Sequence, residues 1–295
     1  MRLTTVPCVV KETCEVNRSF GTGNVRNVTS YDALREAWRN ASIRRGFRFR
    51  EVPCDSGDRS LMLIEFGSPE SPVIHLTAGV HGDEPAGPWA LLSSVEAGLL
   101  DASFSYRIWA CTNPTGYRAE TRVNAEGNDV NRSFSAEAST PESRAIMAEN
   151  LERRFAFAMD LHEDFEADGF YCYEPEVDGR APLSEAIVDA LDLAGFPLQS
   201  LDHSFDLGYP RDPAKADRMR TLERGRVIVN AGAEIRLFPG LPLSLYLLRS
   251  ATSRYVTAET PRRRLWEDRI AMHRLAVTRA LAGVKSLSAK ARPHA

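Results

Sequence analysis

The sequence predicts an α/β protein whose mixed, mostly parallel sheet is covered by helices on both faces. Three observations predict it: short β-type runs alternate with helical patterns, the run Val73–Val80 is almost continuously apolar, and the composition is globular. The 295 residues are 43% hydrophobic and 26% charged, which excludes disordered and fibrous classes. A continuous apolar run is typical of a strand buried on both faces. Because no Pro-, Gly- or Ser-rich linker divides the chain, one domain is favoured over two.

The N-terminal half supplies a helix and then most of the predicted strands. Between Ser30 and Arg44 apolar residues recur at helical spacing, and Ser30 is a suitable N-cap. Turn-forming segments separate the runs that follow. The elements expected next are strands at Phe47–Val52, Ser60–Phe66 and Val73–Val80, a helix at Gly87–Leu99 and a strand at Tyr106–Cys111.

The C-terminal half begins with a strong helix start at Thr140-Pro141-Glu142, where a capping residue, a proline and an acid follow one another. That helix is expected to run to about Arg154. Gly283 is a plausible stop for the last helix. The remaining expected elements are a strand at Phe155–Leu161, a helix at Ser184–Ala194, a strand at Arg254–Ala258 and a long helix at Arg262–Leu281.

Charge, apolar runs and cysteine usage exclude several function classes. The net charge of −3 shows no basic excess, so we expect neither nucleic acid nor a membrane as a partner. No run of ~18 apolar residues predicts a membrane-spanning helix, and the N-terminus lacks the apolar core of a secretory signal. Five scattered cysteines without a C-x-x-C motif favour reduced thiols and a cytoplasmic protein, although Cys8 and Cys14 could pair.

The first chemical motif is His81-Gly82-Asp83-Glu84, directly after the apolar run. Ligands of open α/β sheets gather at the carboxyl ends of strands. An imidazole and a carboxylate three residues apart in a turn can converge on one point, and both are ligands of catalytic zinc ions. An isolated H-x-x-E is more often a surface turn before a helix, so a metal site requires a third ligand elsewhere.

His162 in MDLHED is the candidate third ligand. It also follows a strand-like run, and Asp160, two residues earlier, points to the same side. A metal-bound histidine usually needs a carboxylate or carbonyl on its other nitrogen, a role open to Asp160, Glu163 or Asp164. The alternative is an ordinary loop histidine. Of the other histidines, His273 in the last helix is expected to face solvent.

A polar loop in the middle of the chain brings two arginines and several amides together. It contains NPTGY, beginning at Asn113, and TRVNAEGNDVNRSF, which includes Arg122, Asn131 and Arg132. Arginine makes bidentate, permanently charged contacts with carboxylates. Beside a metal ion such a loop suits an acidic substrate or an oxyanion. Without a metal site it is a solvated loop with surface arginines.

Glu259 in TAETP is the candidate general base. A short β run delivers it just before Pro261 and the last helix, where a lone glutamate is usually structural or solvated. Beside a zinc site it becomes a candidate to take a proton from a metal-bound water. Glu234 in NAGAEIRL and Glu163 are the rivals for this role.

Together these motifs resemble the zinc carboxypeptidase family. Four blocks occur in the family's order, HGDE, NPTGY with TRVNAEGNDVNRSF, DLHED and TAETP, and they span roughly residues 75–261. The resemblance implies a single α/β domain with a mixed sheet of about eight strands and one zinc ion as cofactor. The compact spacing is nearer to murein peptide amidases and to the succinylglutamate desuccinylase/aspartoacylase branch than to digestive enzymes, and NPTGY favours the peptidase side.

The resemblance also implies which residues bind metal and substrate. The family's first histidine and glutamate ligands match His81 and Glu84, and its third ligand matches His162. The pair that holds the substrate's terminal carboxylate matches Asn131 and Arg132.

Two catalytic roles follow from the same resemblance. Arg122 is the best match for the arginine that polarises the scissile carbonyl, and Glu259 matches the catalytic glutamate. The aromatic residue that caps the substrate in digestive enzymes has no secure match. Tyr209, Tyr246 and Tyr255 all stay open for that role.

The leading interpretation is a zinc hydrolase that cleaves an amide or peptide bond next to a free carboxylate, as a metallocarboxypeptidase or peptide amidase acting on a small peptide. The alternative is an N-acyl amino acid deacylase, and a third is a non-catalytic metal-binding module, against which the complete set of ligands and base argues. We expect an N-terminal extension at 1–45, the catalytic domain at 46–285 and a flexible tail at 286–295. Pocket residues are expected between 165 and 250, where the unranked candidates are Asp168, Glu174, Arg211, Arg236 and Arg249. The oligomeric state stays open.

Overall fold

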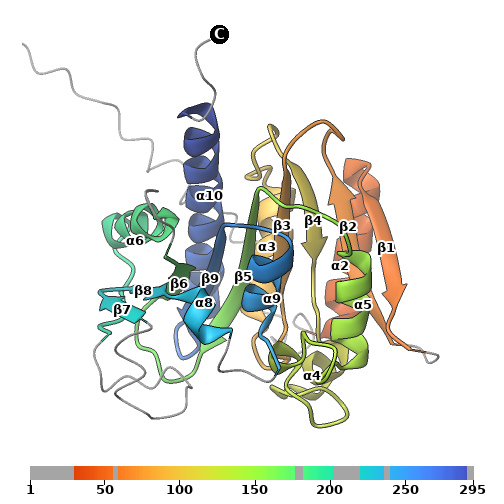
Figure 1. Ribbon diagram of the computed structural model, residues 1–295. Coiled ribbons are helices and arrows are strands. Elements are labelled where there is room, and N and C mark those ends of the chain that lie inside the picture. Colours follow the sequence, from red (N-terminus) through yellow and green to blue (C-terminus); the bar gives the residue numbers. More distant parts are fainter. Residues whose placement is uncertain (1–29, 56–58, 177–181, 202–219, 236–239, 291–295) are drawn as a thin grey trace, which may run out of the picture.

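The described residues form one nine-stranded mixed sheet with helices on both faces (Figure 1). The structure is a computed structural model that describes residues 30–55, 59–176, 182–201, 220–235 and 240–290. The strands in chain order are β1 (Arg48–Pro53), β2 (Ser60–Phe66), β3 (Val73–Ala78), β4 (Ser105–Trp109), β5 (Phe157–Asp164), β6 (Tyr171–Pro175), β7 (Arg220–Glu223), β8 (Arg226–Val229) and β9 (Tyr255–Pro261).

The strand order across the sheet is β1-β2-β4-β3-β5-β9-β6-β8-β7. The four neighbouring strands β4, β3, β5 and β9 run parallel, so their carboxyl ends meet at one edge of the sheet. Antiparallel pairs flank this parallel centre on both sides. The α/β class and the mixed sheet expected from the sequence are confirmed, with one strand more than the expected eight.

Helices cover both faces of this sheet (Figure 1). On one face, helices α2, α3, α6 and α10 pack into the larger apolar core. On the opposite face, α5 and α9 pack into a second core with the other sides of the central strands. The described helices are α2 (Tyr31–Arg45), α3 (Ala86–Glu96), α4 (Pro114–Ala119), α5 (Pro141–Glu149), α6 (Leu183–Leu193), α8 (Ala231–Glu234), α9 (Leu243–Ser250), α10 (Trp266–Lys290) and the short 3₁₀ helix η2 (Val130–Arg132).

The predicted helix starts are confirmed by their capping contacts. The Ser30 hydroxyl accepts a hydrogen bond from the Ala33 amide at the start of α2. Thr140 and Ser143 form a reciprocal capping box at the start of α5, with Pro141 in the first turn. These contacts satisfy amide groups that the first helical turn leaves without partners. Helix α5 ends at Glu149, earlier than the expected Arg154.

The last helix differs from the sequence-based expectation in two ways. It does not stop at Gly283 but continues to Lys290, so residues 286–290 of the expected tail are helical. A Cβ atom at Gly283 would lie 2.7 Å from Leu183 Cδ2, so this glycine serves the close packing of α10 on α6 instead of ending the helix. His273 does not face solvent: it is fully buried, and its Nε2 lies 3.1 Å from the Thr260 hydroxyl.

The N-terminal helix belongs to the main core. Leu34 and Trp38 of α2 are completely buried in the cluster that contains α3 and α10. The three described cysteines, Cys54, Cys111 and Cys172, are free thiols, while the suggested Cys8–Cys14 pair lies outside the described residues. None of the described helices is long and apolar enough to cross a membrane.

Candidate active site

The predicted site residues meet at the carboxyl edge of the parallel strands. His81 and Glu84 lie in the turn between β3 and α3, His162 lies on β5, and Glu259 lies on β9. Both strands run farther than the sequence predicted, and His162 pairs with Glu259 in the β5–β9 register. The turn after β3 packs tightly on α4, because a Cβ atom at Gly82 would lie only 1.9 Å from that helix backbone. Glycine at this position therefore sets where His81 and Glu84 sit.

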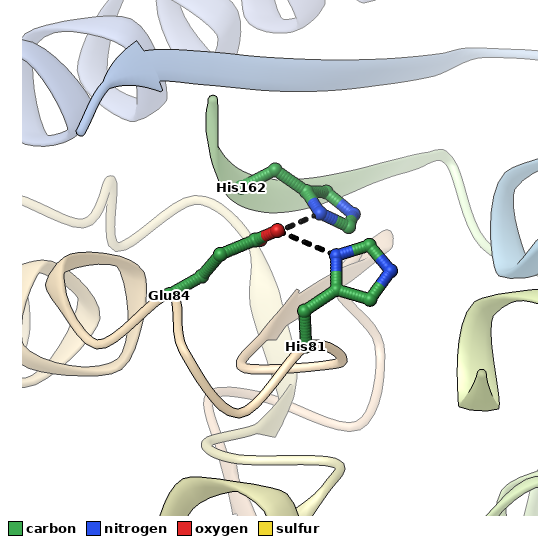
Figure 2. A group of neighbouring side chains, drawn as sticks. All are labelled: His81, Glu84 and His162. Atoms are coloured by element: carbon green, nitrogen blue, oxygen red, sulfur yellow. Dashed lines mark hydrogen bonds and ion pairs between the residues drawn. The ribbon is translucent and has the colours of Figure 1, made fainter. Parts of the chain in front are cut away.

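Two histidines and a carboxylate face one another at this edge (Figure 2). His81 Nδ1 lies 2.5 Å from Glu84 Oε1, and His162 Nδ1 lies 2.9 Å from Glu84 Oε2. One ligand atom from each residue lies within 4.8 Å of the others. All three residues are at most 3% exposed. The structure thus brings together the three residues that the sequence predicted as metal ligands.

A carboxylate also lies behind each histidine. His162 Nε2 is 2.9 Å from Asp160 Oδ2, and His81 Nε2 is 3.3 Å from Asp129 Oδ1. Each outer nitrogen therefore lies near a carboxylate oxygen, an arrangement that orients both rings with Nδ1 toward Glu84. Of the three carboxylates suggested for His162, Asp160 is the one in contact. Asp129 was not singled out from the sequence, although it lies in the TRVNAEGNDVNRSF block.

The charges around the three residues are consistent with a cation site. Burial alone would raise the pKa of Glu84, but the adjacent His81 and His162 hold it well below the ordinary carboxyl range. Burial opposes protonation of His162, yet Asp160 and Glu84 raise its pKa well above the usual value. The buried carboxylates thus stabilise positive charge between them. Two imidazole nitrogens and one carboxylate are also the ligand set of catalytic zinc sites, so the residues present fit such an ion.

Glu259 is half-buried and lies on the strand next to His162. Burial is the main cause that raises the pKa of Glu259 well above the ordinary carboxyl range; His162 opposes this rise, and Glu84 and Asp164 add to it. A carboxyl group with a raised pKa can both accept a proton and donate it again.

Arg122 lies between the metal-ligand group and Asp129. Its Nε and Nη2 donate to Asp129 Oδ2 at 3.2 and 3.1 Å, and its Nη1 lies 3.9 Å from Glu84 Oε1. Asp129 therefore contacts both His81 and Arg122, one through each carboxylate oxygen. About half of the Arg122 side chain is exposed, so the guanidinium can also meet a bound molecule.

Asn131 is held by the first residue of α9, and Arg132 bonds to the backbone of Asn131. The Leu243 amide donates to Asn131 Oδ1 at 2.9 Å, which leaves the side-chain NH₂ of Asn131 as its free donor group. Arg132 Nη1 donates to the Asn131 carbonyl at 2.8 Å. Both side chains line the same cavity as the three candidate metal ligands.

That cavity has a volume of about 630 Å³, which suits a small molecule or a short peptide end. One wall is apolar and comes mainly from α9 and β8. Tyr171 and Tyr173 of β6 also line it, and the sequence-based analysis did not single out either. Tyr171 and Tyr173 lie two residues apart on one strand, so their side chains share a face, and this spacing could have identified them as pocket residues. The apolar wall consists of Val229, Pro242, Leu245 and Leu248.

Several residues considered from the sequence for the general base or for the pocket lie elsewhere or have other partners. Glu163 is buried, with its carboxylate bound to Arg269 and to the Ala86 amide, so it is not free to act as a base. Among the pocket candidates from 165 to 250, Glu174 lines the cavity, but its carboxylate accepts hydrogen bonds from two amides at the start of α6. Glu234 ends α8. Tyr209, Arg211 and Arg236 lie outside the described residues.

Of the two described tyrosines considered as substrate caps, Tyr255 lines the cavity wall and Tyr246 packs on Phe134 with ring centroids 5.9 Å apart. Asp168 and Arg249, which the sequence also offered as pocket residues, are not among the described residues that line this cavity.

Comparison with known proteins supports the same architecture. The family model described as "Succinylglutamate desuccinylase/Aspartoacylase catalytic domain" matches residues 70–205, which include His81, Glu84 and His162. No curated protein matches the sequence significantly. Among solved structures, a protein described as a metallopeptidase from Shewanella baltica OS155 is 21% identical with a TM-score of 0.69, and the match covers 86% of this chain and 92% of that one.

More distant structures have the same fold. The carboxypeptidase A from Helicoverpa armigera is 15% identical with a TM-score of 0.60, over 89% of this chain and 74% of that one. The metallo-carboxypeptidase from Burkholderia cenocepacia is 17% identical with a TM-score of 0.57, over 87% and 69%. The chain therefore has a carboxypeptidase-like fold, and its residues 70–205 are similar to the desuccinylase/aspartoacylase catalytic domain.

Within this carboxypeptidase-like fold, NPTGY forms the start of a short helix. Asn113 Oδ1 accepts a hydrogen bond from the Gly116 amide, and Pro114 occupies the first turn of α4. The Asn113 side-chain NH₂ donates to the Arg122 carbonyl, so the motif also positions the loop that carries Arg122. The expectation that NPTGY favours the peptidase side stays a prediction.

Proposed function

We propose that this protein is a zinc-dependent hydrolase that cleaves an amide bond next to a free carboxylate. The observation that carries the proposal is the convergence, in one cavity, of a His₂Glu group, the half-buried Glu259 and two arginines. The match to a hydrolytic family and the carboxypeptidase-like fold support a metallohydrolase. The ligand types and the cavity support the narrower assignment to a zinc-dependent hydrolase of amide bonds next to a carboxylate.

His81, Glu84 and His162 would hold the metal ion through Nδ1, a carboxylate oxygen and Nδ1. When bound there, a zinc ion supplies Lewis acidity, which polarises a carbonyl and lowers the pKa of a water toward ~7. Asp129 and Asp160 keep both imidazoles in the tautomer that leaves Nδ1 free.

Glu259 would move the proton during hydrolysis. Its carboxylate takes the proton from the attacking water and later gives it to the nitrogen of the leaving amine. Because burial raises its pKa, Glu259 retains that proton long enough to deliver it near neutral pH. Its position opposite His162 on the neighbouring strand places it at the same edge as the metal ligands.

The two arginines would have separate tasks. Arg122, beside Glu84, is placed to stabilise negative charge that develops on the carbonyl oxygen. Arg132 and the amide NH₂ of Asn131 are placed to bind the carboxylate of the substrate. The apolar wall next to Asn131 favours an apolar side chain on the residue that carries this carboxylate.

An N-acyl amino acid deacylase is the second candidate, because the matching family model is that of the desuccinylase/aspartoacylase branch. Both candidates use the same metal, base and arginines. They differ in the group on the acyl side of the cleaved amide, which is a peptide in one case and a simple acid in the other.

A hydrolysis screen tests the proposal. Purified protein, with zinc added or removed by chelation, is incubated with C-terminal dipeptides and tripeptides, γ-linked muropeptides and N-acyl amino acids. We expect zinc-dependent cleavage of one class and loss of cleavage when the terminal carboxylate is amidated. Glu259→Gln should retain zinc and turn over at least about a hundredfold more slowly, whereas Glu166→Gln, at an exposed glutamate that does not line the cavity, should keep most activity. Cleavage that persists in Glu259→Gln, or that ignores the carboxylate, contradicts the proposal.

A further inference from the structure

Two buried polar atoms near His162 have no hydrogen-bond partner among the described residues. They are Asp160 Oδ1 and the hydroxyl oxygen of Tyr255. Asp160 is 1% exposed and Tyr255 is 2% exposed, so water does not reach either group freely. A buried polar atom without a partner is unfavourable, and such atoms in native proteins require an explanation.

The strand register brings these two groups to the same face of the sheet. In the β5–β9 pair, Ala158 lies opposite Tyr255 and Asp160 lies opposite Thr257. Side chains alternate along a strand, so Tyr255 projects from the same face as Asp160. Ala158 is the smallest chiral residue, and it leaves room for the phenol ring of Tyr255 to lie across β5.

The next strand adds a third polar group to this place. Thr77 on β3 pairs with Asp160 in the β3–β5 register, and its hydroxyl donates to the Met159 carbonyl at 3.3 Å. Burial raises the pKa of Tyr255 well above its ordinary value; the Asp160 charge adds to the rise, and the Thr77 hydroxyl opposes it. The two registers therefore place the side chains of Thr77, Asp160 and Tyr255 on the same face of three neighbouring strands.

We propose that Tyr255 is a positioning residue for the metal site, whose hydroxyl donates to Asp160 Oδ1 and thereby fixes the carboxylate that holds His162. Asp160 would then be bound on both oxygens, by His162 Nε2 on one and by Tyr255 on the other. A carboxylate held at both oxygens cannot rotate away from the imidazole. The Nδ1 atom of His162 stays directed at the metal position as a result.

This assignment differs from the substrate-capping role that the sequence left open for Tyr255. A capping residue must present its hydroxyl to the bound molecule, but the hydroxyl oxygen of Tyr255 is shielded from solvent. The ring of Tyr255 forms part of the cavity wall, while its polar end lies on the side of Asp160.

The inference rests on the metal site of the proposed function, and metal affinity, not turnover, is its readout. Zn²⁺ is titrated against a chromophoric chelator in the full-length protein and in the variants Asp160→Asn, Tyr255→Phe and their combination. Absence of stoichiometric zinc in the unaltered protein would refute the proposed metal function itself. A result confined to the Tyr255 variants bears on the present inference alone.

We expect Asp160→Asn to weaken zinc binding by about tenfold to a hundredfold, which is the usual effect of replacing a carboxylate that contacts a metal-bound histidine. Tyr255→Phe should weaken it by about threefold to tenfold, a smaller effect because it acts through Asp160. In the Asp160→Asn background, Tyr255→Phe should change zinc affinity no further, because its partner is already altered. Additive effects of the two substitutions, or an unchanged affinity in Tyr255→Phe, would overturn the proposal.

Two controls separate positioning from general loss of structure. Tyr106→Phe removes another buried phenol hydroxyl, which donates to the Asp101 carbonyl at 2.8 Å, and it should leave zinc affinity unchanged. The absorption spectrum of the Co²⁺-loaded protein should shift in Tyr255→Phe and in Asp160→Asn, but not in Tyr106→Phe. A thermal unfolding curve of each metal-free variant shows whether the fold is intact. Weakened zinc binding in Tyr106→Phe as well as in Tyr255→Phe and Asp160→Asn would instead indicate a general structural effect and refute the proposal.

Discussion

Replacing Arg269 with methionine should destabilise the fold far more than removing an exposed arginine just before the same helix. Arg269 of α10 is 5% exposed, and its Nη1 bonds to Glu163 Oε1. The other oxygen of Glu163 accepts a hydrogen bond from the Ala86 amide at 2.8 Å, at the start of α3. This ion pair therefore joins β5, α3 and α10 directly behind the candidate metal ligands.

The size of the effect follows from the burial of Glu163, which is 3% exposed. Removing one partner of a buried ion pair costs about 3–5 kcal/mol, because the other charge loses its compensation. Burial already raises the pKa of Glu163, so in Arg269→Met this carboxyl can escape part of the cost by taking up a proton. We expect a loss of about 3 kcal/mol at pH 7 and a smaller loss at pH 5, because a carboxyl with a raised folded-state pKa favours the folded state at lower pH.

Urea unfolding followed by circular dichroism measures this loss. Arg264→Met is the matched control, since Arg264 pairs with Asp268 at 3.1 Å but the two side chains are 45% and 30% exposed. Exposed pairs contribute about 0–1 kcal/mol. Adding Glu163→Gln to Arg269→Met should restore most of the stability, because glutamine still accepts from Ala86 without a charge. An Arg269→Met protein no less stable than Arg264→Met would refute the reasoning.

Three further predictions concern the site and the core. Arg132→Ala should raise KM by about ten- to a hundredfold with a smaller change in kcat, and Arg122→Ala should do the reverse in steady-state kinetics; equal effects would contradict the separate roles. Burial lowers the pKa of His75 to about 3, so the free energy of unfolding of the metal-free protein should fall as the pH drops from about 6.5 toward 3. As the pH falls, His75 takes up a proton in the unfolded chain before it does so in the folded protein. His75→Gln should therefore reduce the slope of unfolding free energy against pH by about 1.4 kcal/mol per pH unit. An unchanged slope would contradict the burial of His75 as the cause. Gly82→Ala should weaken zinc binding and cost about 1–3 kcal/mol in urea unfolding, because its Cβ atom would overlap the backbone of α4, whereas Gly232→Ala, with only one atom at 3.7 Å, should do neither.

The sequence by itself determined the class of fold and the main chemical groups. Alternating β-type and helical runs predicted the layered α/β architecture, because hydrophobic periodicity reports which faces are buried. Ser30 and Thr140 predicted helix starts correctly, since a cap acts on amides only two or three residues away. His81, Glu84 and His162 were selected because each follows or ends an apolar run, and carboxyl ends of parallel strands share an edge.

Tertiary structure decided what depends on contacts between distant segments. Strand alternation placed Asp160 on the same side as His162, but sequence could not choose among the nearby carboxylates. That choice depends on Glu163 pairing with Arg269, 106 residues away, which leaves Asp160 as the carboxylate in contact with the imidazole. Asp129 was missed for the same reason, since its two partners come from different loops.

The errors in the last helix have one physical origin. Gly283 has the local character of a helix stop, and His273 is a polar residue of the kind usually exposed on a helix, but both residues pack against other elements. Local propensity amounts to about 1 kcal/mol or less per residue, so burial against α6 and β9 outweighs it. Burial depends on which elements become neighbours, and that information is distributed over the whole chain.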